Sequence, residues 1–287
     1  MDAIRIGDIA VAPVVDDANT LFEVFHFYPD ATKEALEAEY GWMVPRHFDP
    51  QEGNLLCRTQ GFVLRAGGKN ILIDTCVGND KPGRPRPTWT NAKFPFLDNL
   101  ARAGFAPDDI HAVLCTHLHV DHAGWNTRLD NGKWVPTFPN AEYLTNETEM
   151  RALERRRDHG PPFYRHLYDD SVLPVIRSGQ VVKVQMDHIV SDGVALEPSP
   201  GHTPGHVCVR VASGKDAAVA IGDMMHHPIQ AVHPDWNSRH CEDQPLARKT
   251  RREFLERMAD TGAWVLPAHF EPCRVKRHDA AFRLEFA

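Results

Sequence analysis

The sequence has little of what marks a membrane protein or a secreted one. No apolar run approaches the roughly 18 residues that a membrane-spanning helix requires. The first residues, Met1 to Arg5, lack the basic-then-apolar layout of a signal peptide. We therefore predict a cytoplasmic protein that has no membrane partner.

Positive charge is not in excess either, because the formal net charge is −7. Phosphate backbones are bound by clustered Lys and Arg side chains, so this balance argues against a nucleic-acid partner. Two basic stretches, 151–157 and 248–252, include or adjoin a Glu and follow helical patterns. We interpret both stretches as solvent-facing helix surfaces.

Cysteine pairs are also absent. The six cysteines are widely spaced, and no two of them form a CxxC pair. Most lie in apolar, strand-like runs, which favours reduced, buried thiols over disulfides or a cysteine-based zinc site. The cysteines are Cys57, Cys76, Cys115, Cys208, Cys241 and Cys273.

The chain is long enough and apolar enough to bury a sizeable core, with 287 residues of which 42% are hydrophobic. Residues 1–287 are predicted to form a single domain, in which 1–50 is an N-terminal extension that serves as a pocket or dimer element. Strand-like runs are expected at 4–15, 55–64, 71–76, 112–115, 181–184, 194–196, 207–211, 217–221 and 264–266. Helical periodicity is expected at 92–103, 148–157 and 245–261.

The segment 116–122 places three imidazoles and a carboxylate directly after the buried strand expected at 112–115. Just past a strand end, residues two apart still project to a common side, so His117 and His119 can converge on one ion. Asp121 and His122 follow after the chain has turned, so they can face a second ion. The spacing predicts a site for two metal ions, roughly 3.5–4 Å apart.

Two ions need further ligands, and three other strand ends offer them. His202 stands in the Gly/Pro-rich turn 200–206, Asp223 ends the apolar run 217–223, and His269 ends the run 264–269. Each alone is weak evidence, because a lone His or Asp after a strand is more often a turn or capping residue. Together with segment 116–122 they form a strong pattern.

In this order, the motifs HxHxDH, GHTPGH, GD and PAH resemble the metallo-β-lactamase superfamily, and the resemblance extends from Gly61 to about Leu284. It implies a four-layer αββα sandwich of the α/β class, with the ligands on one rim. Two groups of strands with helices outside them agree with this fold, although periodicity alone does not define two sheets. His206 would not be a ligand, and Asp74 would support the metal loops through hydrogen bonds. The implied ligands are His117, His119 and His202 for the first ion, Asp121, His122 and His269 for the second, and Asp223 as a bridge.

The chemistry expected of two bound divalent ions is hydrolysis. A hydroxide held between them is a nucleophile at neutral pH, because metal charge lowers the pKa of water from about 15.7 to roughly 7. Asp121 and Asp223 are expected to set the charge balance and to move the proton. Zinc is the first choice of metal, while manganese, cobalt and iron suit the same ligands.

Within the superfamily, segments 119–126 and 222–230 look most like the branch that contains lactonases and methyl parathion hydrolase. We predict a small-molecule substrate, a lactone or carboxylic ester. Related N-acyl homoserine lactonases carry a Tyr a few residues after the bridging Asp, whereas this chain has His226, which argues against a homoserine-lactone preference. His226 is interpreted as a catalytic hydrogen-bond donor to the substrate or leaving group, or else as a supporting or surface His.

Other functions stay open on the same ligand set. A phosphotriesterase or a thioesterase would use the same site, and a non-hydrolytic iron enzyme of this fold is a less favoured alternative. A binding protein with a dead site would lack ligands, and none is missing.

Two segments are candidates for the substrate entrance. The proline-rich stretch 81–89 cannot be regular structure and is predicted to be a loop near the metal rim. The stretch 21–28 is unusually aromatic, so it is expected to line the pocket or to pack in the core or in a homodimer interface.

Overall fold

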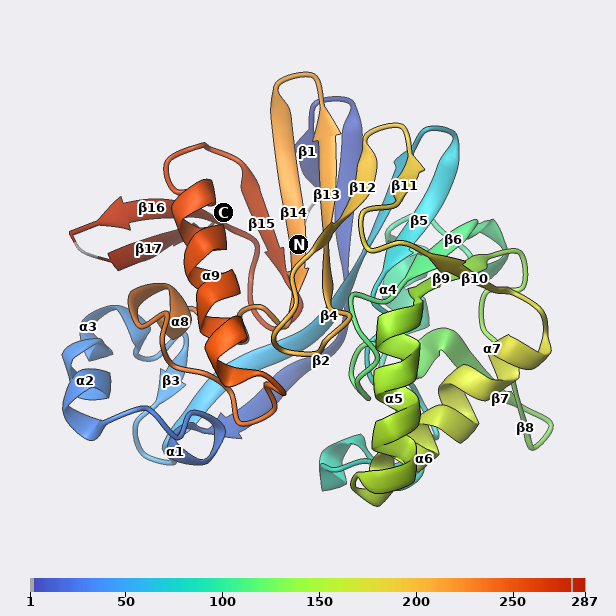
Figure 1. Cartoon of the computed structure of the whole chain (residues 1–287), viewed down its shortest axis with the longest axis horizontal. Coiled ribbons are helices and arrows are strands. Elements are labelled where there is room, and N and C mark those ends of the chain that lie inside the picture. The colour runs from blue at the N-terminus through green and yellow to red at the C-terminus, as the bar shows by residue number, and fades with distance from the viewer. Residues whose placement is uncertain (1–2, 280, 287) are drawn as a thin grey trace.

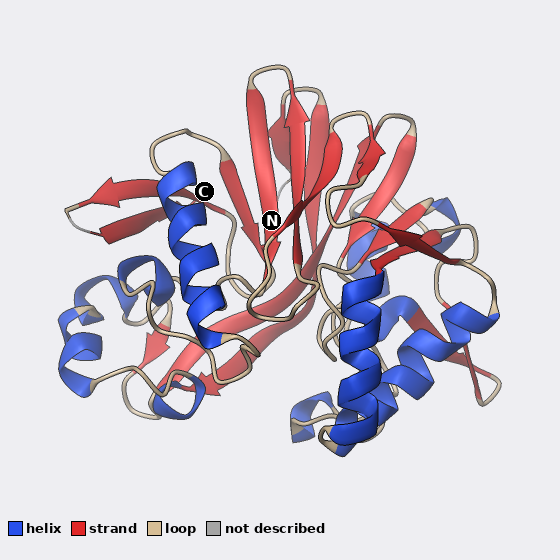
Figure 2. Ribbon diagram, in the orientation of Figure 1, coloured by secondary structure: helices blue, strands red, loops and turns tan. Residues whose placement is uncertain are grey.

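The strands of the molecule form two large sheets that lie in its middle, and the helices lie outside them (Figure 1, Figure 2). The computed structural model describes residues 3–279 and 281–286. The first sheet has the order β1-β2-β4-β5-β6-β9-β10, with β3 paired to β4. Its strands are β1 (Ile4–Ile6), β2 (Ile9–Glu23), β3 (Phe48–Asp49), β4 (Asn54–Ala66), β5 (Lys69–Ile73), β6 (Ala112–Leu114), β9 (Glu142–Asn146) and β10 (Val181–Val184).

The second sheet has the order β11-β12-β13-β14-β15-β16-β17. Its strands are β11 (Ile189–Ser191), β12 (Val194–Pro198), β13 (Val207–Ser213), β14 (Asp216–Gly222), β15 (Trp264–Pro267), β16 (Cys273–His278) and β17 (Ala281–Phe286). A separate hairpin consists of β7 (Thr127–Asp130) and β8 (Lys133–Pro136).

The longest helices begin at side-chain caps. Asn146 Oδ1 accepts the N–H of Glu149 at the start of α5, and Asp243 Oδ1 accepts the N–H of Leu246 at the start of α9. In the described part of the chain, no helix is long and apolar enough to cross a membrane. The helices are α1 (Val24–Phe27), α2 (Lys33–Ala38), α3 (Tyr40–Met43), α4 (Phe96–Arg102), α5 (Glu147–His159), α6 (Pro162–Leu167), α7 (Leu173–Arg177), α8 (Ile229–Val232) and α9 (Gln244–Met258).

Side chains alternate along the strands between two apolar layers, which confirms the predicted sandwich. On β4, Phe62 and Leu64 point into the core between the sheets, while Val63 packs with the α4 side chains outside. On β14, Ala220 faces the same inner core, and Val219 packs against α9. Both sheets therefore bury both faces, and the layers run helix, sheet, sheet, helix.

The basic stretch 248–252 differs from the expectation of a solvent-facing surface. Arg251 is fully buried and donates to the carbonyl oxygens of Met224 and Pro234 and to Asn237 Oδ1. Its neighbour Arg252 is exposed and pairs with an aspartate, as expected of a helix surface. The sequence does not distinguish Arg251 from its exposed neighbours on α9. The acceptors that satisfy its guanidinium group lie in other segments of the chain, so a count of charges along the helix does not reveal them.

The ligand-bearing loop after β6 lies against the loop after β5 through backbone hydrogen bonds. Thr75 N–H donates to His122 O, and Gly124 N–H donates to Cys76 O, each over 2.7 Å. This close approach leaves no room for a side chain at position 124, where a Cβ would overlap the carbonyl oxygen of Val77. The glycine therefore sets the distance between the two loops.

Replacing Gly124 by Ala is expected to lower the free energy of unfolding by about 2–3 kcal/mol, because the two loops must separate. Gly41→Ala is the matched control: nothing lies within 4 Å of its Cβ position, so stability should change by no more than about 1 kcal/mol. Urea unfolding of both variants measures the difference. Equal stabilities would contradict the role assigned to Gly124.

Candidate metal centre

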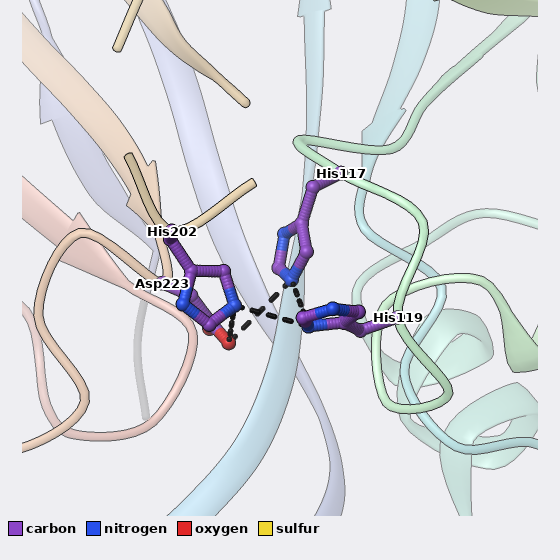
Figure 3. A group of neighbouring side chains, drawn as sticks. All are labelled: His117, His119, His202 and Asp223. Atoms are coloured by element: carbon purple, nitrogen blue, oxygen red, sulfur yellow. Dashed lines mark hydrogen bonds and ion pairs between the residues drawn. The ribbon is translucent and has the colours of Figure 1, made fainter. Parts of the chain in front are cut away.

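Four of the expected ligands converge at one rim of the sandwich, where the carboxyl ends of β6, β12 and β14 meet (Figure 3). His119 Nδ1 lies 3.0 Å from His117 Nε2 and 3.0 Å from His202 Nε2. Asp223 Oδ2 lies 3.1 Å from His202 Nε2 and 3.5 Å from His117 Nε2. Three ring nitrogens and one carboxylate oxygen therefore surround a common point.

A second group lies on the other side of the same carboxylate. Asp223 Oδ1 is 2.9 Å from His122 Nε2 and 2.8 Å from His269 Nε2. Asp121 completes this group, with Oδ2 at 3.7 Å from His269 Nε2. Each oxygen of Asp223 thus faces a different cluster, which is the arrangement expected of a carboxylate that bridges two cations. The structure brings together all seven ligands named from the sequence.

The second ring nitrogen of each histidine has its own neighbour, so the facing nitrogens can present lone pairs to the centre. The carboxylate of Asp74, as expected, contacts an outer ring nitrogen and also accepts the N–H of Thr116 over 2.7 Å. The outer contacts are His117 Nδ1 with Thr116 Oγ1 (3.2 Å), His119 Nε2 with Tyr164 Oη (3.1 Å), His122 Nδ1 with Asp74 Oδ2 (3.1 Å), His202 Nδ1 with Cys241 Sγ (3.6 Å) and His269 Nδ1 with the Arg58 carbonyl oxygen (3.0 Å).

The charges of the site fit cations. Burial holds the pKa of His117, His119 and His202 well below the usual range, so these rings are neutral ligands. Burial opposes ionisation of Asp223, but the surrounding imidazoles, His122 first, hold its pKa well below the usual value. Within the described residues, Asp223 forms ion pairs with imidazoles and not with Lys or Arg. Burial opposes protonation of His122 and His269, but the nearby carboxylates, Asp223 first, raise the pKa of both rings. A buried anion requires positive charge, which these two rings supply when protonated and which divalent ions would supply when bound.

His206 does not face this centre. Its Nε2 accepts the backbone N–H of Asp223 over 3.1 Å, and its Nδ1 lies 2.8 Å from Ser199 Oγ. It therefore positions Asp223 through the backbone, in line with its interpretation as a supporting residue.

Glu149 on α5 connects the two loops of the first cluster, a role that the sequence analysis missed. Its buried carboxylate accepts the N–H of Leu118 (3.0 Å), the hydroxyl of Thr203 (2.7 Å) and the N–H of Gly205 (3.1 Å). Arg156 Nη2 neutralises it at 2.7 Å. The available signal was Glu149 three residues after the cap Asn146, a spacing typical of a capping box. Here the Glu side chain turns to the metal loops instead.

A cavity of about 300 Å³ opens onto the centre. Its floor includes His119, Asp121, Asp223 and His226. The segments expected at the entrance both contribute to its walls, which are largely aromatic. These wall residues are Phe22, Glu23, His26 and Phe27 from segment 21–28, Pro85, Arg86 and Trp89 from segment 81–89, Phe163 and Tyr164 from α6, and the single residues Val120 and His240. Segment 81–89 is not a loop throughout, because Pro87–Trp89 forms a short 3-10 helix.

His226 is buried at the floor of this cavity. Its Nε2 lies 3.1 Å from Asp223 Oδ2, and its ring is parallel to that of His269, with centroids 5.5 Å apart. The structure thus places His226 beside the Asp223 carboxylate and in the lining of the cavity.

The cysteines do not form a metal site or disulfides. All six are free, and five of them are buried while Cys115 is half-buried. Burial raises the pKa of Cys241, so this thiol is protonated where it contacts the ring of His202.

The sequence model of the Metallo-beta-lactamase superfamily matches residues 56–269, about three quarters of the chain. An N-acyl homoserine lactonase of Bacillus thuringiensis is 28% identical over 122 residues, which cover 42% of this chain and 41% of that protein. An N-acyl homoserine lactonase of a Bacillus species is 27% identical over 172 residues, covering 56% of this chain and 60% of that protein. The matches thus span 41 to 60% of the lengths of these relatives.

Solved structures share the fold along the whole chain. The dizinc quorum-quenching lactonase AidC, in complex with a product, has a TM-score of 0.81 at 20% identity and covers 100% of this chain and 97% of its own. The hydrolase AbOPH of the β-lactamase superfamily has a TM-score of 0.83 at 18% identity, with the same coverage. At such identities the likeness concerns the fold.

Glu149→Gln is expected to weaken metal binding about 10- to 100-fold, because an amide cannot accept all these bonds and removes the closer of the two carboxylates that pair with Arg156. Glu147→Gln is the control, since Glu147 lies on the same helix with an exposed side chain. Titration with zinc against a chromophoric chelator measures both affinities. Unchanged affinity in Glu149→Gln would show that the two loops hold their positions without this carboxylate.

Proposed function

Because the chain belongs to the metallo-beta-lactamase superfamily, we propose that it is a dinuclear metal-dependent hydrolase that cleaves lactones or carboxylic esters. One observation carries the proposal: the two oxygens of Asp223 face two separate ligand clusters at the floor of a cavity. A site for a single structural ion would have no need of a shared carboxylate open to a cavity.

Two divalent ions, when bound, supply a nucleophile at neutral pH and Lewis acidity toward a carbonyl group. The chain contributes the rest. Asp223 and Asp121 compensate the positive charge, and Asp121, whose side chain keeps 12% exposure at the cavity, is placed to take or return a proton. His226 reaches the same cavity and is proposed to donate to the substrate or to the leaving group.

The aromatic part of the walls favours a partly apolar substrate. Aromatic rings bind acyl or aryl groups by burying their surface, and relatives named as N-acyl homoserine lactonases support a lactone. No serine or cysteine nucleophile is required. Burial raises the pKa of all six cysteine thiols, so they are protonated. The same chemistry would cleave phosphotriesters and thioesters, so both are included in the substrate comparison below.

Three expectations from the sequence stay predictions: zinc as the native metal, cytoplasmic residence, and a single domain over 1–287.

We also propose that the protein forms a homodimer. The side chains of Leu21 and Phe25 are apolar and exposed, 41% and 44% accessible, next to the cavity wall, and a second copy of the chain could cover them. Analytical ultracentrifugation distinguishes a dimer from a monomer.

Asp223→Asn and His117→Ala are each expected to lower kcat/KM by at least about 10³-fold, because a buried ligand lost from either cluster removes metal and charge balance together. His278→Ala is the control, since this histidine is exposed on β16. Hydrolysis rates are measured together with bound zinc per chain. Full activity in Asp223→Asn with two bound ions would disprove the bridging role.

Removal of the metal with a chelator is expected to abolish hydrolysis, and added zinc should restore it. The substrates to compare by kcat/KM are an aryl lactone, an aryl ester, a thioester and a phosphotriester. A lactone or ester in first place supports the proposal. If the thioester or the phosphotriester has the highest kcat/KM, the proposed metal centre stands but the proposed substrate class is wrong. If activity survives removal of the metal, the proposed mechanism is wrong.

A further inference from the structure

Arg86 brings a positive charge to the wall of the cavity, where it has no carboxylate partner. Its guanidinium carbon lies 4.6 Å from the ring centre of Phe22 and 5.2 Å from that of Trp89. Its Nη2 donates to the carbonyl oxygen of Leu21, while its Nε is buried and has no hydrogen-bond partner among the described residues. Most of the N–H groups of this guanidinium are therefore available to a bound molecule.

The carboxylates that line the cavity have other partners. Glu23 accepts the N–H groups of Phe25 and His26 at the start of α1, over 3.2 and 2.6 Å. Asp121 and Asp223 face the imidazoles of the ligand clusters, so their charge belongs to the metal centre. Within the described part of the chain, none of these carboxylates forms an ion pair with Arg86.

Burial acts against the charge of Arg86. It lowers the pKa of this half-buried side chain from its usual value, and the carboxylate of Asp121 opposes the shift. The guanidinium group stays protonated all the same, because its pKa in water is so high. Asp17 accepts the indole N–H of Trp89 over 3.3 Å and forms no described ion pair with Arg86 either. A ligand with negative charge would compensate this cation.

The segment that carries Arg86 is held in place on both sides. Two residues earlier, Arg84 is buried and donates to both carboxylate oxygens of Asp170, over 3.0 and 2.9 Å. The carbonyl oxygen of Arg86 accepts the N–H of Trp89 over 3.0 Å, where the short helix Pro87–Trp89 begins. The guanidinium group is therefore positioned before any ligand binds.

We propose that Arg86 is a specificity-determining residue that binds a carboxylate group of the substrate. The inference rests on the proposed hydrolase function and narrows its substrate class to esters and lactones that also carry a free carboxylate. A guanidinium group presents parallel N–H groups that match the two oxygens of a carboxylate. Because Arg86 lies in the wall and the ligand clusters lie at the floor, a stretch of the substrate separates this carboxylate from the scissile carbonyl group.

Aryl monoesters of adipic, suberic and sebacic acid test the proposal. Each is compared with the ester in which a carboxamide replaces the free carboxylate, so the members of a pair have nearly the same shape and differ in charge. The different chain lengths sample the distance from Arg86 to the scissile carbonyl group. In the wild type, kcat/KM should be at least about tenfold higher for the carboxylate member of the best pair, through a lower KM.

Arg86→Met removes the charge and keeps an unbranched side chain against the aromatic rings. It should lower kcat/KM for the carboxylate ester roughly 10- to 100-fold, the effect of a lost charged hydrogen bond, and leave the carboxamide ester within about threefold. Arg86→Lys should keep part of the preference, because it retains the charge without the paired N–H groups. Arg128→Met is the control, since Arg128 is exposed on β7 and is not in the cavity lining.

A guanidinium group that only supports the wall would give a different result. Equal losses in Arg86→Met on both members of a pair would mean that Arg86 holds Phe22 and the backbone of Leu21 without contacting the substrate, and would overturn the proposal. Equal kcat/KM for both members in the wild type, at every chain length, would overturn it without any variant.

Binding of the products is measured independently of the rates. Hydrolysis adds water across the acyl C–O bond and releases the aryl alcohol, so the carboxylate ester gives a dicarboxylate and the carboxamide ester gives a monocarboxylate. Both products keep one carboxylate for the metal centre. Calorimetry on the zinc-loaded protein should show tighter binding of the dicarboxylate to the wild type, and Arg86→Met should lose this difference. Equal binding of the two products to the wild type would overturn the proposal.

The two proposals fail separately. If the wild type hydrolyses none of these esters, the hydrolase function is wrong for this class, while calorimetry on the products still decides whether Arg86 binds a carboxylate. If both members of every pair are hydrolysed equally well, the hydrolase function stands and the role of Arg86 does not.

Discussion

The burial of one carboxylate group imposes the main constraint on this structure. Asp223 is almost fully enclosed, and within the described chain only imidazoles pair with it. An anion in such a place is stable only if positive charge and hydrogen bonds surround it. The loops after β6, β12 and β15 each bring histidines to it, and the sheet edges hold these loops at fixed positions.

Polar side chains behind the ligands connect these loops to one another. Glu149 joins the loop of His117 to that of His202, Asp74 joins β5 to the loop after β6, and His206 holds the backbone of Asp223. Each of them is buried and forms hydrogen bonds with a segment other than its own. Ligand geometry is therefore set by hydrogen bonds between distant segments and not by the conformation of any single loop.

The chemistry of the cavity follows from the same arrangement. Its floor is polar because the ligands end there, while its walls are largely aromatic because the N-terminal segment, segment 81–89 and α6 cover the rim. The N-terminal segment reaches the rim as the continuation of β2, which pairs with β4 from Val11 to Glu23. Segments that are far apart along the chain thus decide which molecules reach the reacting groups.

The amino-acid sequence by itself predicted the seven residues that the fold brings together in two clusters, and the long core elements. HxHxDH is a local motif, and the strands and helices of the core have strong periodicity, so both depend on neighbours in sequence. The short strand β9, by contrast, was not predicted, because the polar segment Glu142–Asn146 becomes a strand only between the parallel partners β6 and β10.

Only the tertiary structure decided the contacts of Glu149, Tyr164 and Arg251. Each looks like an ordinary helix residue in the sequence, and its partners lie in other segments. The spacing of Glu149 to Asn146 indicates only a capping box, and the hydrogen bonds that these three side chains form with other segments depend on how the helices are placed on the sheets. The sequence therefore determined which atoms can bind metal, and the packing of helices and sheets determined how those atoms are held and what lies beside them.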